Sequence, residues 1–132
     1  MNDHREMAHR ALKRLLANGR LTAVPKRPAD QALLVALAAS QIDAHRSCVE
    51  SELNERLGTW LETISEPFGI DHVTLRRMLV DSGFLTRTRS GSMYQINAQR
   101  LGEIEAFRGI EPAEILAQVR NERDLRKLQH AT

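Results

Sequence analysis

Residues 71–96 read DHVTLRRMLVDSGFLTRTRSGSMYQI, and within this stretch a helical pattern gives way to a strand pattern. Asp71 is a residue type that caps helix starts, apolar residues then repeat at helical spacing, and Gly83 is typical of the position just past a helix end. The segments 84–88 and 92–96 are rich in aromatic, Thr and Ile residues and flank an Arg-Ser-Gly turn. The sequence therefore predicts a helix followed directly by a β-hairpin.

Two more helices are expected before this unit. Pro28 suits the first turn of a helix, which the apolar spacing extends to about Ile42. Ser47 and Glu50 form a capping-box pattern, and a stripe of apolar residues follows at helical spacing. The order helix, helix, loop, helix, hairpin is that of a winged helix-turn-helix. We therefore predict a mainly α fold with a small β-hairpin and a winged helix-turn-helix core over about residues 28–97.

Helical patterns also flank this core, at about residues 4–18 and about residues 99–129, and two prolines make residues 19–28 an extended connector. The length fits a single domain over residues 1–132. The terminal helices carry apolar faces: Ala8, Leu12 and Leu15, and Ile115 and Val119. These faces pack either on the winged core of the same chain or against a second subunit in a homodimer, and the sequence leaves both arrangements open.

Composition places the chain among ordinary globular proteins, with 42% hydrophobic and 27% charged residues. Its longest apolar run, residues 32–39, is far shorter than the ~20 residues that a membrane-spanning helix needs. The charged N-terminus does not resemble a secretion signal, and the single cysteine, Cys48, fits a reducing compartment. We therefore expect a cytoplasmic protein.

Basic side chains gather on the predicted helix and hairpin, where residues 67–100 carry five basic and two acidic groups, although the whole chain has a net charge of only +2. On a helical wheel, Thr74 and Arg77 lie opposite the apolar face, with Arg76 at its edge. In a winged helix-turn-helix this helix lies in the DNA major groove, and the hairpin touches the backbone. We therefore predict that Thr74, Arg76 and Arg77 approach base edges of double-stranded DNA while Arg87 and Arg89 hold phosphates.

Two features favour a different interpretation, a protein-interaction or regulatory module that does not contact DNA. Asp81 lies four residues after Arg77, so the two side chains can neutralise each other on the helix surface. The preceding helix carries Glu50, Glu52 and Glu55, which repel phosphates. The two hypotheses differ on one point. DNA binding requires that Arg77 forms no ion pair with Asp81, whereas in an interaction module the two side chains stay paired.

Motifs for catalysis and cofactor binding are missing from the sequence. The five histidines form no i, i+4 pair, and one cysteine adds no cluster, so no metal site is predicted. The sequence contains no glycine-rich phosphate loop, and Glu103 and Glu105 lie on different helix faces. We expect no catalysis, no cofactor and no small-molecule substrate. Because single-strand binders need exposed aromatics and only 4% of residues are aromatic, duplex DNA is the expected nucleic acid.

A set of short motifs runs from the connector to the hairpin: Gly19-Arg20-Leu21-Thr22, then Glu52-Leu53-Asn54, then residues 71–87, then Tyr94. Together they resemble the bacterial domain of unknown function 2087 family over about residues 19–97. The resemblance implies a small winged-helix protein. Because some members carry the domain behind an arsenic-repressor-type DNA-binding domain, it also implies a link to transcription. The positions that the resemblance carries over are Arg76, Arg77, Asp81, Gly83 and Arg87. This chain departs from the family pattern at residues 48–51, where an aromatic and an acidic residue are usual.

Overall fold

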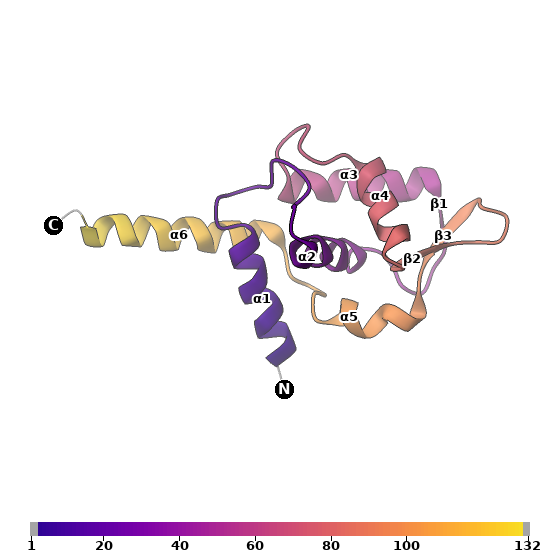
Figure 1. Ribbon diagram of the computed structural model, residues 1–132, viewed down its shortest axis with the longest axis horizontal. Coiled ribbons are helices and arrows are strands. Elements are labelled where there is room, and N and C mark those ends of the chain that lie inside the picture. The colour runs from indigo at the N-terminus through magenta and orange to yellow at the C-terminus, as the bar shows by residue number, and fades with distance from the viewer. Residues whose placement is uncertain (1–2, 131–132) are drawn as a thin grey trace.

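The computed structural model describes residues 3–130, which form a mainly helical protein with one small sheet (Figure 1). The elements in chain order are α1 (Asp3–Leu15), α2 (Pro28–Ala39), β1 (Cys48–Val49), α3 (Glu50–Ile64), α4 (His72–Asp81), β2 (Leu85–Arg87), β3 (Met93–Ile96), the 3-10 helix η1 (Ala98–Arg100), α5 (Leu101–Glu105) and α6 (Pro112–His130). The predicted fold class, mainly α with a small hairpin, is confirmed. From α2 to β3, the order of elements is that of a winged helix-turn-helix.

The sheet is antiparallel, with the strand order β1-β3-β2. Its strand β1 was not predicted, because Ser47 to Glu50 were interpreted as a capping box. That interpretation is wrong: Cys48 pairs with Tyr94 of β3, and α3 begins at Glu50 without a side-chain cap. The Ser47 hydroxyl instead donates to the Gln95 side chain at 3.1 Å. Two residues are too short a run to show strand periodicity, and tertiary pairing decides their conformation.

The turn from α4 into the hairpin follows the predicted signals. The Asp71 carboxylate accepts a hydrogen bond from the backbone N–H of Thr74 at 2.7 Å and so caps the first turn of α4. At the other end, Gly83 has a φ of +84°, a left-handed conformation that favours glycine. Its amide donates to the Val80 carbonyl, which closes the helix and directs the chain into β2.

The core is made mostly of leucines that project inward from four helices. The side chains with no exposed surface include Leu12, Leu16, Leu34, Leu37, Leu53, Leu57, Leu75 and Leu79. The terminal helices join this core, because Ala8, Leu12, Ile115 and Val119 are buried within the same chain, whereas Leu15 is only partly buried. No helix in the part of the chain that the structure describes is both long and apolar enough to cross a membrane.

The connector before α2 is tied to the loop between α3 and α4. Leu21 forms a parallel bridge with Ser65, in which its amide donates to Ile64 at 2.8 Å and its carbonyl accepts from Glu66 at 2.8 Å. Gly69 packs so closely beneath this bridge that a Cβ there would lie 3.0 Å from the Thr22 carbonyl oxygen. The connector is therefore part of the packed structure next to the start of α4.

The cap of α4 gives a prediction about pH. The hydrogen bond from the Thr74 amide lowers the pKa of Asp71 below its ordinary value of 3.8. Because the folded-state pKa is the lower one, the ionised cap stabilises the protein above pH 3.8 and loses this effect as the pH falls through the folded-state value. We expect Asp71→Ala to lower the free energy of unfolding by about 1 kcal/mol at neutral pH.

Urea unfolding at several pH values measures this effect. The gap between Asp71→Ala and the natural protein should narrow as the pH falls below 3.8. Asp71→Asn is the matched control, since its amide oxygen still caps the helix but carries no charge to titrate. An Asp71→Ala gap that stays the same size in acid would contradict the assignment of an ionised cap.

Candidate nucleic-acid interface

The outward face of α4 carries Arg77, which has no ion-pair partner among residues 3–130. Leu75 and Leu79 are fully buried on the inner face, which leaves Arg77 and Asp81 exposed on the opposite one. Among residues 3–130, neither Arg77 nor Asp81 takes part in an ion pair or a side-chain hydrogen bond. The neutralisation by Asp81 that the sequence allows is therefore not made, and the Arg77 guanidinium is available to a ligand.

Arg76 lies differently, against the preceding helix. Its guanidinium donates to the Asn54 side-chain oxygen of α3, and its Nη2 lies 3.7 Å from Glu50 Oε1. Only 18% of the Arg76 side chain is exposed. These contacts hold α4 on α3, and the predicted approach of Arg76 to base edges requires the side chain to leave them.

Glu50 joins the two helices to the hairpin. Its Oε1 accepts a hydrogen bond from the Tyr94 hydroxyl at 2.9 Å and lies 3.8 Å from Arg87 Nη2. The Arg87 guanidinium carbon in turn lies 5.2 Å from the centre of the Tyr94 ring, within the range of a cation–π contact. One carboxylate thus faces Arg76 of α4 and Arg87 and Tyr94 of the hairpin.

A groove of about 230 Å³ lies between α4 and the hairpin. It is lined by five residues of α4, which include Arg76, Arg77 and one carboxylate, Asp81, and by Arg87 and Tyr94 of the hairpin. Guanidinium groups bind phosphate and carboxylate oxygens in pairs of parallel hydrogen bonds. This arrangement of three arginines can therefore hold an anionic oxygen group.

The hairpin turn presents Arg89 to solvent. Gly91 has a φ of +75°, and its amide donates to the Thr88 carbonyl at 2.8 Å, which closes the turn. The Ser90 and Ser92 hydroxyls are hydrogen-bonded at 2.6 Å across it. Within the described chain, Arg89 is exposed and takes part in no ion pair. A fixed turn with an available cation at its tip suits contact with a phosphate backbone.

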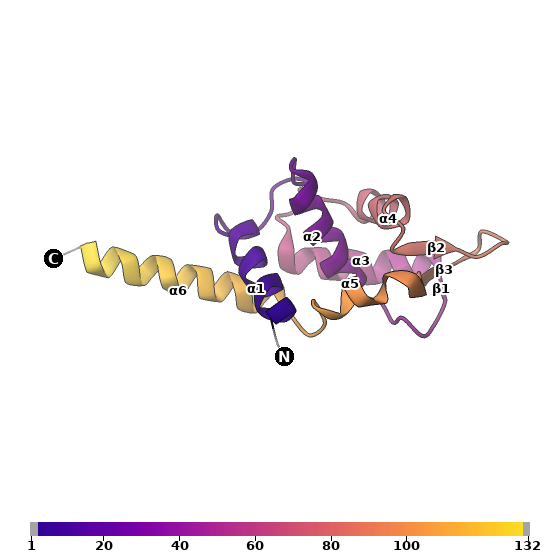
Figure 2. The same cartoon turned by 60° about the horizontal axis from the view of Figure 1, so that its bottom comes forward.

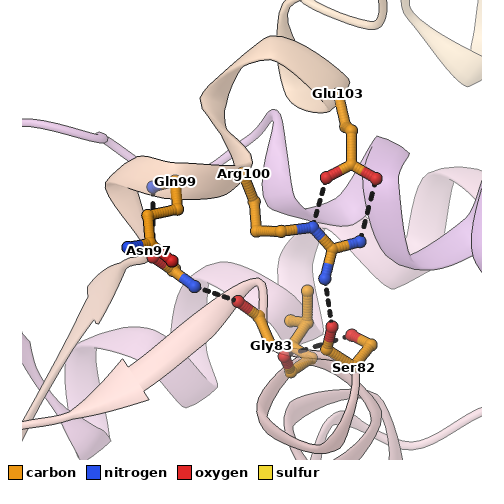
Figure 3. Close-up of polar contacts among 7 residues, drawn as sticks. Ser82, Gly83, Asn97, Gln99, Arg100 and Glu103 are labelled. Carbon is orange, nitrogen blue, oxygen red and sulfur yellow. Dashed lines mark hydrogen bonds and ion pairs between the residues drawn. The ribbon is translucent and has the colours of Figure 1, made fainter.

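The base of the hairpin is braced by Arg100 of η1 (Figure 3). Its guanidinium donates to the Ser82 carbonyl and to both carboxylate oxygens of Glu103, and it lies 4.1 Å from the centre of the Phe84 ring. Beside it, the Asn97 side chain donates to the Gly83 carbonyl at 2.9 Å. These bonds connect the end of β3 to the end of α4, so they fix the hairpin relative to the outward face of α4.

The Arg100–Glu103 pair also changes the acidity of both groups. The hydrogen bond from Arg100 lowers the pKa of Glu103, and the same bond raises the pKa of Arg100. Both side chains are therefore charged at neutral pH. From the sequence, Glu103 was predicted to be only a surface carboxylate. An Arg and a Glu three residues apart on a helix are nevertheless a pattern from which their ion pair could have been predicted.

Cys48 lies at the edge of the sheet and is partly buried. Burial raises the pKa of its thiol, and the nearby Glu52 carboxylate adds to the rise. The thiol is therefore protonated at neutral pH, whereas a cysteine nucleophile reacts as the thiolate.

Of the five predicted contact residues, the structure brings four to one side of the molecule around α4 and the hairpin. Arg76, Arg77 and Arg87 line the groove, and Arg89 lies on the hairpin turn that extends from it (Figure 1). Thr74 is half-buried, and its backbone amide is used by the Asp71 cap. The pairing role of Glu50 was missed, because it depends on the unpredicted strand β1.

Residues 20–96 match the family described as "Uncharacterized protein conserved in bacteria (DUF2087)". Searches of curated proteins and of solved structures returned no match. The matched range runs from the connector through α2, the three-stranded sheet, α3 and α4, and it contains the groove and the hairpin turn. It covers more than half of the chain, and the chain therefore belongs to this bacterial DUF2087 family.

Proposed function

We propose that the protein is a small cytoplasmic DNA-binding protein associated with transcription, and that it acts by binding rather than by catalysis. The observation that carries this proposal is the exposed Arg77 on the outward face of α4, which is not neutralised by Asp81. A winged helix-turn-helix presents this face to the major groove of duplex DNA. There, arginine forms two hydrogen bonds with a guanine edge.

In the proposed complex the arginines have different roles. Arg77 approaches base edges, and Arg89 binds a phosphate near the hairpin turn. Arg76 remains attached to α3 through Asn54 and keeps α4 in position. This division departs from the expectation that Arg76 itself approaches the bases.

In the proposed complex, Arg87 leaves the Glu50 carboxylate and binds a DNA phosphate. Its ion pair with Glu50 is long, at 3.8 Å, and both side chains are about half exposed, at 54% and 48%. Exposed ion pairs of this kind are worth only about 0–1 kcal/mol. A DNA phosphate can therefore take Arg87 from Glu50 at small cost, while the Tyr94 ring keeps the guanidinium beside the groove.

Fluorescence anisotropy with random duplex DNA at two salt concentrations tests the proposal. We expect binding that weakens steeply with salt, because the arginines displace counterions from phosphates. The double variant Arg87→Ala with Arg89→Ala should weaken binding to all sequences alike and reduce the salt slope by about 2, one for each phosphate contact.

Arg10→Ala with Arg14→Ala removes two exposed charges from α1 and serves as the matched control. Equal losses in the two double variants would mean that general charge, rather than the hairpin, governs binding. Negligible binding of the natural protein at low salt would overturn the DNA-binding proposal.

The second candidate function, a protein-interaction module, is favoured by Phe68. This residue lies in the loop between α3 and α4, is fully exposed at 106%, and has a φ of +65° that is unusual for a bulky side chain. The neighbouring Glu62 and Glu66 carboxylates have no ion pair among residues 3–130. The hollow beside Phe68 is lined by the carboxylates of Glu62, Glu66 and Asp71 and by one arginine, Arg20, and this excess of negative charge suits a basic protein surface. Flat DNA titrations together with loss of a protein partner in Phe68→Ala would favour this function.

A further inference from the structure

The C-terminal half of α6 extends beyond the rest of the molecule, on the side away from the hairpin (Figures 1 and 2). Only Pro112, Ile115 and Val119 of this helix are buried, and every residue from 120 to 130 is exposed. The middle of the helix is held on the end of α1, where Lys13 pairs with Glu122 and Arg123 donates to the Ala17 carbonyl. About two turns follow Arg123 without a buried side chain.

Such a segment has little to stabilise it in the isolated chain. Short helices without tertiary packing are marginal in water. The exposed turns nevertheless carry two large apolar side chains, Leu125 and Leu128, with 58% and 68% of their surfaces exposed. Burial of both leucines would provide the missing stabilisation.

The two leucines belong to a continuous face of α6. Ala113, Ala117, Asn121, Leu125 and Leu128 follow one another at intervals of four, four, four and three residues, and all five are exposed. We call them the α6 seam. They lie on the side of the helix opposite Ile115 and Val119, so the seam stays accessible while the other side packs on the core.

We propose that the α6 seam binds the same seam of a second copy of this chain, with the two helices antiparallel and centred on Asn121. The seam has small residues in its first half and large ones in its second. Antiparallel pairing therefore places Leu125 against Ala117 of the partner, and it brings Leu128 to the partner's first turn. A groove of about 700 Å³ runs beside Ala113 and Ala117 and leaves room for a second helix. Its lining includes Leu116 and Val119 together with charged side chains such as Glu62, Glu66 and Arg120. A contact of this type is closed and two-fold symmetric.

Charges along the edge of the seam favour the antiparallel direction. Arg120 and Asp124 are exposed on the same flank and have no ion pair among the described residues. In an antiparallel pair the same flank of each helix meets, so Asp124 comes within one helical turn of the partner's Arg120, and the contact occurs twice. A parallel pair joins opposite flanks of the two helices, so it would not bring Asp124 to the partner's Arg120. Such edge charges set the orientation of paired helices.

Sedimentation equilibrium of the full chain over a range of concentrations tests this association. We expect a concentration-dependent species of twice the monomer mass of 14.9 kDa. Leu125→Glu with Leu128→Glu should abolish it. Because both positions are exposed in the single chain, the thermal unfolding of the variant should match that of the natural protein at a concentration where the natural protein is monomeric. Met7→Glu, at an exposed apolar residue of α1, is the control that should still dimerise. A monomeric natural protein, or a dimer that survives the double substitution, would overturn the proposal.

Cysteine crosslinking in a Cys48→Ser background tests the direction. Asn121→Cys lies on the two-fold axis and should form an intermolecular disulfide on oxidation. Leu128→Cys should not, because an antiparallel pair separates the two copies of this position by about 21 Å along the helix axis. A disulfide between two copies of Leu128→Cys would overturn the antiparallel arrangement. If Asn121→Cys forms no disulfide, the two helices are not centred on residue 121. Neither measurement involves DNA, so the result is independent of the proposed DNA binding.

Discussion

Arg77→Gln should bind duplex DNA roughly 10- to 100-fold more weakly than the natural protein, since an arginine on a base edge contributes about 1–3 kcal/mol. The side chain takes part in no hydrogen bond or ion pair within the described chain, so its replacement removes no polar interaction from the folded protein. The loss should also be greater on the best-bound sequence than on random DNA, because base contacts carry the sequence information. Anisotropy titrations of both DNAs measure the two effects together.

Substitution of the neighbouring Asp81 should change the DNA affinity in the opposite direction. Asp81→Asn removes a negative charge from the same face of α4 and should tighten binding slightly. Thermal unfolding of both variants should match that of the natural protein, because both residues are exposed. If Arg77→Gln binds as tightly as the natural protein, α4 does not read the DNA, and the contact must be assigned to another surface.

Leu79→Ala should lower the free energy of unfolding by about 2–5 kcal/mol, which is the range for a leucine truncated in a packed core. Leu79 has no exposed surface and lies on the inner face of α4, and its carbonyl accepts the Phe84 amide at 3.0 Å where the chain turns toward the hairpin. A cavity at this point loosens α4 next to that turn. Urea unfolding followed by circular dichroism measures the change.

Val73→Ala is the matched comparison on the same helix. Val73 is 40% exposed, so its truncation should change stability by only about 0.5 kcal/mol. Losses of similar size in the two variants would mean that α4 is not packed by its leucine face. The DNA affinity of Leu79→Ala should be compared at a temperature where both proteins are folded.

Local signals predicted the part of the molecule around α4 well. The Asp71 cap, the leucines on one face and the left-handed Gly83 are all short-range features, and each occurs as predicted. The exposed residues of the candidate interface could be predicted from the same helical periodicity, because a helix that turns Leu75 toward the core turns Arg77 toward solvent. The hairpin could be predicted equally well, because the residues that form its turn follow one another in the chain.

Contacts between distant residues were not predictable in this way. The strand β1 exists only through its pairing with β3, more than forty positions later in the chain, and Glu50 acquires its hairpin partners Arg87 and Tyr94 because that strand brings α3 to the hairpin. The helical pattern predicted over about residues 99–129 is divided in the structure into the short η1, α5 and α6, and α2 ends at Ala39 rather than near Ile42. Helix ends of this kind are set by packing, which a single sequence does not record.

The bridge between Leu21 and Ser65 determines at which residue a shortened fragment that keeps this fold has to begin. A fragment starting at Pro28 would lose the donor for the Ile64 carbonyl and the acceptor for the Glu66 amide, next to the start of α4. It would also uncover Gly69. A fusion or chimaera that keeps the connector from Gly19 onward retains both bonds, and the family match likewise begins at Arg20 rather than at the first helix of the core.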